Sequence, residues 1–263
     1  MTRPVPIICL AHRSRHPQAD QAVVEIAERI AESTGVPAFA AFLDFHPATL
    51  ATVAHRVVAA GYTEAVVVPL LFTRAFHTRH DVPAAIAEAA ESIDATSSAS
   101  LTLHLADGLG TGADMEELVA DFTARYLAEI TAGSANAESA VHAANAANAA
   151  SAGASIDKLA LYSVGSSQPG ANKAIAEFAE RVGARLNMRT TRSFVATGEH
   201  PGRDTNALLD FADERTVTVP LFVSPGLLWD RAKDRMPSGR TCTRHLGAAV
   251  APVVISRACC ALP

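Results

Sequence analysis

The chain has 263 residues, of which 49% are hydrophobic and 19% charged, and its formal net charge is -5 at pH 7. This length exceeds that of a common single domain, so two packed domains are expected. The acidic balance argues against a nucleic-acid-binding protein, which normally shows a basic patch or stripe. No apolar run approaches the ~20 residues of a membrane span, and no small-residue cleavage pattern follows the first apolar stretch. We therefore expect a cytoplasmic protein that binds neither nucleic acid nor membranes.

Short apolar runs alternate with helical periodicity along the chain. In the first part, strands are expected at residues 7–11, 39–43, 65–71 and 101–105, and helices at residues 19–33, 48–60, 82–93 and 115–130. The pattern restarts at Lys158, with strands expected at residues 159–164, 193–196 and 216–221 and helices at residues 171–186, 205–212 and 225–235. Strands that are apolar throughout and separated by helices indicate parallel sheets covered on both faces.

A segment of low complexity separates the two series of elements. Residues 133–155 are almost wholly Ala, Asn, Ser and Gly, which offer too little apolar bulk for tight docking. We therefore expect an N-terminal domain over residues 1–132, a linker over residues 133–157 and a C-terminal domain over residues 158–263.

The two series are copies of each other. Ser14 and Pro17 after the first strand fall on Ser166 and Pro169, and the run from residue 66 is echoed by the run from residue 217. The last turn also repeats, since Leu246 and Gly247 correspond to Leu109 and Gly110. Two histidines, however, have no counterpart in the second copy, because His12 corresponds to Val164 and His77 to Leu228. A duplication in which one copy lacks both imidazoles suggests that the first half performs the chemistry and that the second half forms one side of the substrate-binding cleft.

Three polar residues follow successive strands of the first half. His12, Asp44 and His77 come after the first, second and third predicted strands. In open parallel sheets, ligands bind outside the carboxyl ends of the strands. Two imidazoles and a carboxylate can give a divalent transition metal a partial shell of nitrogen and oxygen ligands. His16 and His46 are interpreted as loop residues, while His80 is either an auxiliary ligand or a solvated helix position, of which we favour the latter.

The same segments resemble a known family. Residues 12–17 resemble the His-Gly-Ser-Arg-Asp-Pro segment of class II chelatases of the sirohydrochlorin chelatase type, with Arg13 in place of glycine. Residues 69–83 look like the family's Gly-Tyr-His-Val-Arg-x-Asp-Ile-Pro segment, residues 41–44 match its Phe-Leu-Glu or Phe-Leu-Asp strand, and residues 109–110 match a further loop. The resemblance covers nearly the whole chain outside the linker. It implies an α/β fold of two similar doubly wound parallel-sheet domains facing across a cleft.

The resemblance also implies an activity. Class II chelatases of this type insert Fe2+ or Co2+ into sirohydrochlorin without ATP, in the synthesis of siroheme or cobalamin. By this resemblance His12 and His77 are expected to bind the metal and accept protons, and Asp44 to be a weaker acidic metal ligand. The metal would then be a substrate, and no permanently bound cofactor is expected.

Further residues of the matched segments are expected to contact the tetrapyrrole. Its carboxylates could pair with arginine side chains in forked geometry. The expected substrate-binding residues are Arg13, Ser14, Arg15, Arg74, Arg79, Leu109 and Gly110.

The proposed chemistry asks for such residues independently of the family. Insertion of a divalent metal displaces two pyrrolic protons, and neutral imidazole, with a reference pKa of about 6.5, can hold the metal or accept a proton. The phosphate-binding pattern Gly-x-x-x-x-Gly-Lys-[Ser/Thr] does not occur, so nothing suggests nucleotide hydrolysis. Iron and cobalt both stay open, because these ligands accept either metal.

Two other function classes remain open at this point. The chain could be a metal or tetrapyrrole carrier without turnover, or another doubly wound enzyme, because fold alone does not fix function. The chain has only four cysteines, and Cys9 lies inside a predicted buried strand, so no disulfide framework is expected. Cys242, Cys259 and Cys260 lie near the chain end without Cys-x-x-Cys spacing, which argues against an iron–sulfur centre. A monomer is expected.

Overall fold

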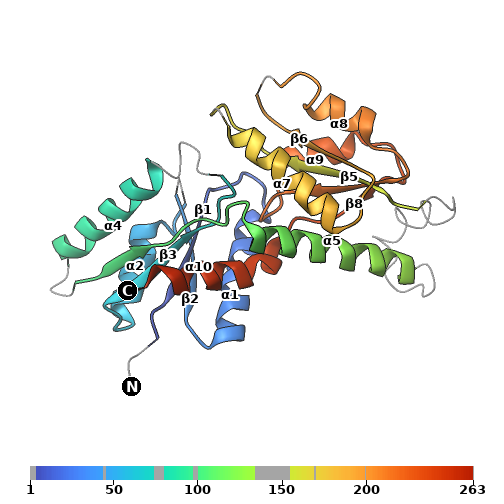
Figure 1. The fold of residues 1–263 in the computed structure, drawn as a ribbon. Helices are drawn as coiled ribbons and strands as arrows, with labels where there is room; N and C mark the ends of the chain where they lie inside the picture. Colours follow the sequence, from blue (N-terminus) through green and yellow to red (C-terminus); the bar gives the residue numbers. More distant parts are fainter. Residues whose placement is uncertain are drawn as a thin grey trace. The chain divides into compact units, whose positions relative to one another are not determined.

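The computed structural model describes residues 4–43, 46–73, 80–96, 100–133, 155–168, 170–198 and 200–262. The chain divides into two compact units, one formed by Met1–Gly110 with Gly247–Pro263 and the other by Thr111–Leu246. Each unit contains a four-stranded parallel sheet with helices packed against it (Figure 1). The predicted fold class, two similar doubly wound α/β units, is confirmed.

The first unit has the sheet order β2-β1-β3-β4. Its strands are β1 (Ile7–Ala11), β2 (Ala38–Phe42), β3 (Glu64–Pro69) and β4 (Thr102–Leu105). Its helices are α1 (Ala19–Thr34), α2 (Leu50–Ala59), α4 (Asp81–Thr96), the 3-10 helix η1 (Gly247–Val250) and α10 (Ala251–Ala261). Every residue of β1 is buried, as expected for a central strand covered on both faces.

One core cluster of the first unit lies between the sheet and helices α2 and α4. Ile8 and Leu10 of β1 cluster with Val67 of β3, Val53 of α2 and Ile93 of α4. Helix α10 packs against α1 and β3 instead, so the last helix of the chain belongs to the first unit.

The second unit repeats this order as β6-β5-β7-β8. Its strands are β5 (Lys158–Ser163), β6 (Thr190–Val195), β7 (Thr216–Pro220) and β8 (Thr241–Cys242). Its helices are α5 (Ala113–Gly133), α7 (Ala171–Arg185), α8 (Thr205–Phe211) and α9 (Leu227–Asp234). Tyr162, Phe194, Leu208 and Trp229 form much of its core, with the rings of Tyr162 and Trp229 5.7 Å apart.

The duplication read from the sequence is visible in the backbone of both sheets. The third strand of each sheet ends in proline, and Leu10 pairs with Pro69 just as Tyr162 pairs with Pro220. The serine hydroxyl after each first strand accepts a hydrogen bond from the amide two residues on, at 3.1 Å in both Ser14 and Ser166. The predicted alignment of the two copies therefore holds at the level of single hydrogen bonds.

The compact units differ from the domain boundaries expected at residues 132 and 158. Helix α5 packs against α7 and belongs to the second unit, so the Ala- and Asn-rich segment after it joins two elements of one unit. Two ion pairs support this packing, because Glu116 of α5 accepts hydrogen bonds from Arg181 at 2.8 Å and Arg185 at 2.5 Å. Helix α10, which sequence analysis did not predict, lies in the first unit. An amphipathic pattern shows that a helix packs, but not on which sheet.

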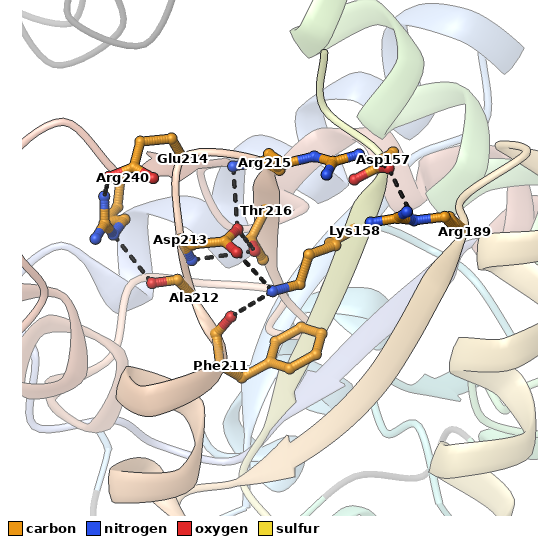
Figure 2. A network of polar contacts seen from close by, with 10 residues as sticks. All are labelled: Asp157, Lys158, Arg189, Phe211, Ala212, Asp213, Glu214, Arg215, Thr216 and Arg240. Atoms are coloured by element: carbon orange, nitrogen blue, oxygen red, sulfur yellow. Dashed lines mark hydrogen bonds and ion pairs between the residues drawn. The ribbon is translucent and has the colours of Figure 1, made fainter. Parts of the chain in front are cut away.

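A network of hydrogen bonds and ion pairs lies at the amino-terminal edge of the second sheet (Figure 2). Lys158, the first residue of β5, donates to the carbonyl of Phe211 at 2.9 Å and pairs with the Asp213 carboxylate at 2.8 Å. The other oxygen of Asp213 accepts from the amide of Arg215 at 3.0 Å and the hydroxyl of Thr216 at 2.7 Å. These bonds join the start of β5 to the turn that precedes β7, at the edge opposite the strand ends where ligands bind.

Among the described residues, no helix combines the length and the apolar character that crossing a membrane requires.

Candidate functional site at the carboxyl edge of the first sheet

The order of the strands marks one place in the first sheet where a site is expected. The chain passes from β1 outward to β2, and from β3 outward to β4 on the other side. The carboxyl ends of β1 and β3 therefore flank the point at which the winding direction reverses, where open α/β sheets form their ligand crevice.

His12 lies at this point. It follows β1 directly, it is partly buried, and its Nε2 atom is buried. The ladder continues up to it on both sides, since Leu43 donates to the carbonyl of Ala11 at 3.0 Å and Leu70 donates to that of Leu10 at 2.8 Å. The histidine is thus held by a rigid strand, between the segments that leave β2 and β3.

The turn after His12 is fixed by side-chain caps. Ser14 Oγ accepts from the amide of His16 at 3.1 Å, and His16 Nδ1 accepts from the amide of Gln18 at 3.1 Å. Arg13 and Arg15 are exposed, and Ser14 is partly buried. The turn therefore directs two guanidinium groups to solvent, beside the histidine.

Arg13 stands where the chelatase segment that it resembles has glycine, and it does so without straining the backbone. In the described part of the chain, Asn187 is the one non-glycine residue with positive φ, so Arg13 avoids the left-handed region. Its counterpart Gly165 has φ +90°, and a Cβ there would lie 2.7 Å from the carbonyl oxygen of Thr197. The second copy needs glycine at this turn, whereas the first copy accepts a cationic side chain.

Four expected site residues lie outside the described residues: Asp44, Arg74, His77 and Arg79. Asp44 follows Leu43 in the sequence, and Leu43 donates a hydrogen bond to the carbonyl of Ala11 at the end of β1. The other three follow Thr73 after β3. Within the described ranges, no group of three or more His, Cys, Asp and Glu side chains could hold a metal ion. The ligand set of His12, Asp44 and His77 thus stays a prediction.

The loop after β4 approaches the end of β3 closely. A Cβ at Gly108 would lie 2.8 Å from the carbonyl oxygen of Leu71, and Gly110, at φ +68°, donates to the same oxygen at 3.2 Å. Leu109 is fully buried, so its side chain belongs to the core and its backbone is what this loop presents. Glycine on both sides allows that close approach.

Arg257 of α10 holds this loop from the other side. Its Nε donates to the carbonyl of Gly108 at 3.0 Å and its Nη2 to that of Leu109 at 2.9 Å. The forked guanidinium thereby fixes two successive peptide groups next to the β3 exit. Sequence analysis missed Arg257, because 148 residues separate it from Leu109 and no local pattern links the two.

A second imidazole at this edge has a defined role that sequence analysis also missed. His46 Nδ1 accepts from the amide of Ala48 at 3.0 Å, and its Nε2 lies 3.1 Å from Oδ2 of Asp20 on α1. A backbone N–H always donates, so Nδ1 carries no proton and Nε2 donates to the carboxylate. The ring also packs against Phe42, with centroids 4.0 Å apart. The available signal was the repeated His-Pro pair, because His16 caps its turn in the same way.

The comparisons with known proteins agree with this arrangement. Residues 6–126 match the family model of CbiX. The resemblance to the class II chelatases is confirmed. Two solved structures match over 97% of this chain and 94% of their own chains. One is SirB from Bacillus subtilis with Fe3+, at TM-score 0.67 and 18% identity. The other is the sirohydrochlorin chelatase SirB from Bacillus subtilis subspecies spizizenii in complex with cobalt, at TM-score 0.66 and 19% identity.

A third solved structure covers less of the chain. The putative cobalamin biosynthesis CbiX protein from Marinobacter aquaeolei VT8 is 27% identical over 48% of this chain and 99% of its own, with TM-score 0.41. No curated protein matches the sequence. The SirB matches show a shared fold over nearly the whole chain. The segment matched by the CbiX family model, residues 6–126, includes His12 and His77.

Proposed function

We propose that this protein is a chelatase that inserts Fe2+ or Co2+ into sirohydrochlorin without ATP. The observation that carries the proposal is the position of His12, held by β1 at the topological switch point and inside the segment that matches CbiX. The SirB structures that share the fold hold iron or cobalt, and one of them is a sirohydrochlorin chelatase. On this proposal the divalent metal is a substrate and the product belongs to siroheme or cobalamin synthesis.

Each member of the proposed site has a chemical task. His12 and His77 bind the metal and accept the two pyrrolic protons, since neutral imidazole has a lone pair available near neutral pH. Asp44 supplies a carboxylate ligand. Imidazole and carboxylate suit iron and cobalt and leave coordination positions open for the macrocycle.

The anionic tetrapyrrole is bound by cationic groups around the histidines. Arg13 and Arg15 are exposed beside His12, which leaves their guanidinium groups accessible to substrate carboxylates. Arg74 and Arg79 add to this set from the segment after β3. Ser14 supports substrate binding by capping the turn that carries Arg13 and Arg15. Leu109 and Gly110 contact the substrate through the backbone of the loop that Arg257 fixes.

The test is an anaerobic insertion assay with the whole chain. Pure protein, sirohydrochlorin and Co2+ or Fe2+ are mixed, and the absorbance change of the macrocycle is followed against the rate without protein. We expect many turnovers per protein molecule with at least one metal. A single stoichiometric change would identify a carrier instead, and no macrocycle binding at all would point to another enzyme on this fold.

A further inference from the structure

The Asp20–His46 pair links the segment that follows β1 to the segment that follows β2. Asp20 lies in the first turn of α1, eight positions after His12, and His46 lies two positions after Asp44. The hydrogen bond between them, at 3.1 Å, therefore joins the start of α1, the helix that follows the His12 loop, to the connection that contains Asp44. Both segments carry residues that the proposed function assigns to the metal.

The carboxylate of Asp20 depends on this bond. Its Oδ2 receives the imidazole N–H, while its Oδ1 is buried and accepts no hydrogen bond from any described residue. A charge-assisted bond is about twice as strong as a neutral one, so His46 is the main compensation for this charge. Loss of the partner would release the imidazole and leave the carboxylate poorly satisfied.

The second copy builds the same link without a charge. Asn172 in the first turn of α7 lies 2.8 Å from His200 Nε2. The amide orientation is set because Asn172 Oδ1 accepts from the amide of Ser166 at 2.9 Å, so Nδ2 is the donor. His200 therefore accepts where His46 donates. Gly198 makes room for the ring, since a Cβ there would lie 2.9 Å from His200 Nε2.

This internal comparison separates two roles for the link. An amide suffices to tie a first helix to the exit of a second strand, as the second copy shows. The carboxylate version occurs in the copy that carries His12, Asp44 and His77. Where a carboxylate orients an imidazole that ligates a metal, its loss typically weakens metal affinity about 10- to 100-fold. The Asp20–His46 pair would act in a similar way on the segments that carry the ligands.

We propose that Asp20 and His46 are a positioning pair that holds the first unit's metal-binding segments ready for the divalent metal. The inference rests on the proposed function and deepens it. Neither residue is required to touch the metal, because the pair acts by fixing the segments on either side of it.

The test compares three variants with the wild type. Asp20→Ala removes the pair, Asp20→Asn reproduces the uncharged link of the second copy, and His46→Gln keeps an N–H donor for Asp20. The matched control is His104→Ala, which removes a similar imidazole–carboxylate pair of the same unit, His104–Glu64 at 2.9 Å. That pair joins β4 to the first residue of β3, away from the carboxyl edge, and its side chains are 21% and 49% exposed against 18% and 40% for His46 and Asp20.

Two quantities are measured for each folded variant. Isothermal titration gives the affinity for Co2+ without tetrapyrrole, and the insertion assay gives KM for Co2+ and kcat separately. We expect Asp20→Ala to weaken Co2+ binding and raise KM for Co2+ by about 10-fold or more. The Co2+ affinity of Asp20→Asn should lie between those of Asp20→Ala and the wild type. His46→Gln should retain most of the wild-type Co2+ affinity. His104→Ala should bind Co2+ like the wild type.

The outcomes separate the two proposals. If the wild type binds Co2+ but inserts none, the proposed function fails, and the Co2+ affinities alone decide the positioning role. Wild-type Co2+ affinity in both Asp20 variants would overturn the inference while leaving the proposed function intact. An equal loss in His104→Ala would also overturn it, because the effect would then be general destabilisation. If Asp20→Ala does not fold, Asp20→Asn decides, and a wild type that binds no Co2+ contradicts both proposals.

Discussion

Among single residues, Asp213 shows how the second unit is fixed at the edge away from ligands. Burial tends to raise the pKa of its carboxyl, but hydrogen bonds from Lys158, Thr216 and the amide of Arg215 outweigh this and lower the pKa from 3.8 to about 2. The ionised form is thus preferred in the folded chain. It stabilises the fold above about pH 4, and that contribution is lost as the pH falls towards about 2.

Asp213→Asn should therefore lower stability in a pH-dependent way. Because the side chain is 43% exposed, solvent screening limits the expected loss at pH 7 to ~1 kcal/mol of unfolding free energy. Urea unfolding at pH 7 and at successively lower pH measures it, and the difference from wild type should shrink as the pH approaches 2. Glu177→Gln is the control, since its pair with Lys173 is exposed on α7 and should contribute almost nothing. A difference that stays constant with pH would contradict the role of Asp213.

Residue types predicted part of the site and missed the rest. His12 could be found because it directly follows an apolar strand, and the strand then places it at the carboxyl edge. Asp20 gave no such signal, since an acidic residue in the first turn of a helix is ordinary. Its role depends on a partner 26 positions away, His46, which a reading of local pattern cannot supply.

Between elements, the loop after β4 approaches the exit of β3 closely in the first unit. Gly108→Ala would place a Cβ 2.8 Å from the Leu71 carbonyl oxygen and 3.3 Å from that of Pro69. Neither backbone atom can move without disturbing the sheet, so we expect a loss of roughly 1–3 kcal/mol of unfolding free energy. Insertion should fall as well, because the shifted loop would lose its bonds to Arg257.

Gly226→Ala is the control for this substitution. Its Cβ would lie 3.7 Å from the Phe222 ring, an ordinary contact, and its φ of -155° suits any residue. Thermal unfolding of both variants gives the comparison. Equal stability of the two would show that the close approach at Gly108 does not constrain the loop.

The elements that the sequence predicted best were those with a clear hydrophobic pattern. Apolar runs gave β1, β3, β5 and β7, because central parallel strands are buried on both faces. Helix α10 was missed, because the repeat was followed only as far as the turn at Leu246 and Gly247, which precedes it. Strand β8 is also shorter than its counterpart, with two residues against four in β4.

For the whole molecule, duplication was the most reliable sequence signal. It predicted two similar units, and both sheets have the same order and the same proline at the end of the third strand. The limits of the compact units could not be predicted in this way. They depend on where α5 and α10 pack, and those contacts join residues that are distant in the sequence.

The central claim is that the first copy performs the metal chemistry and the second does not. The most direct measurement is the insertion rate of His12→Ala and His77→Ala beside Val164→Ala, which alters an exposed residue at the position in the second copy that corresponds to His12. Each histidine variant should lose activity by ~100-fold or more, the effect of removing an acid–base group, with an unchanged melting temperature. Val164→Ala should keep wild-type turnover. Wild-type turnover in both histidine variants, with loss of activity in Val164→Ala, would contradict the account.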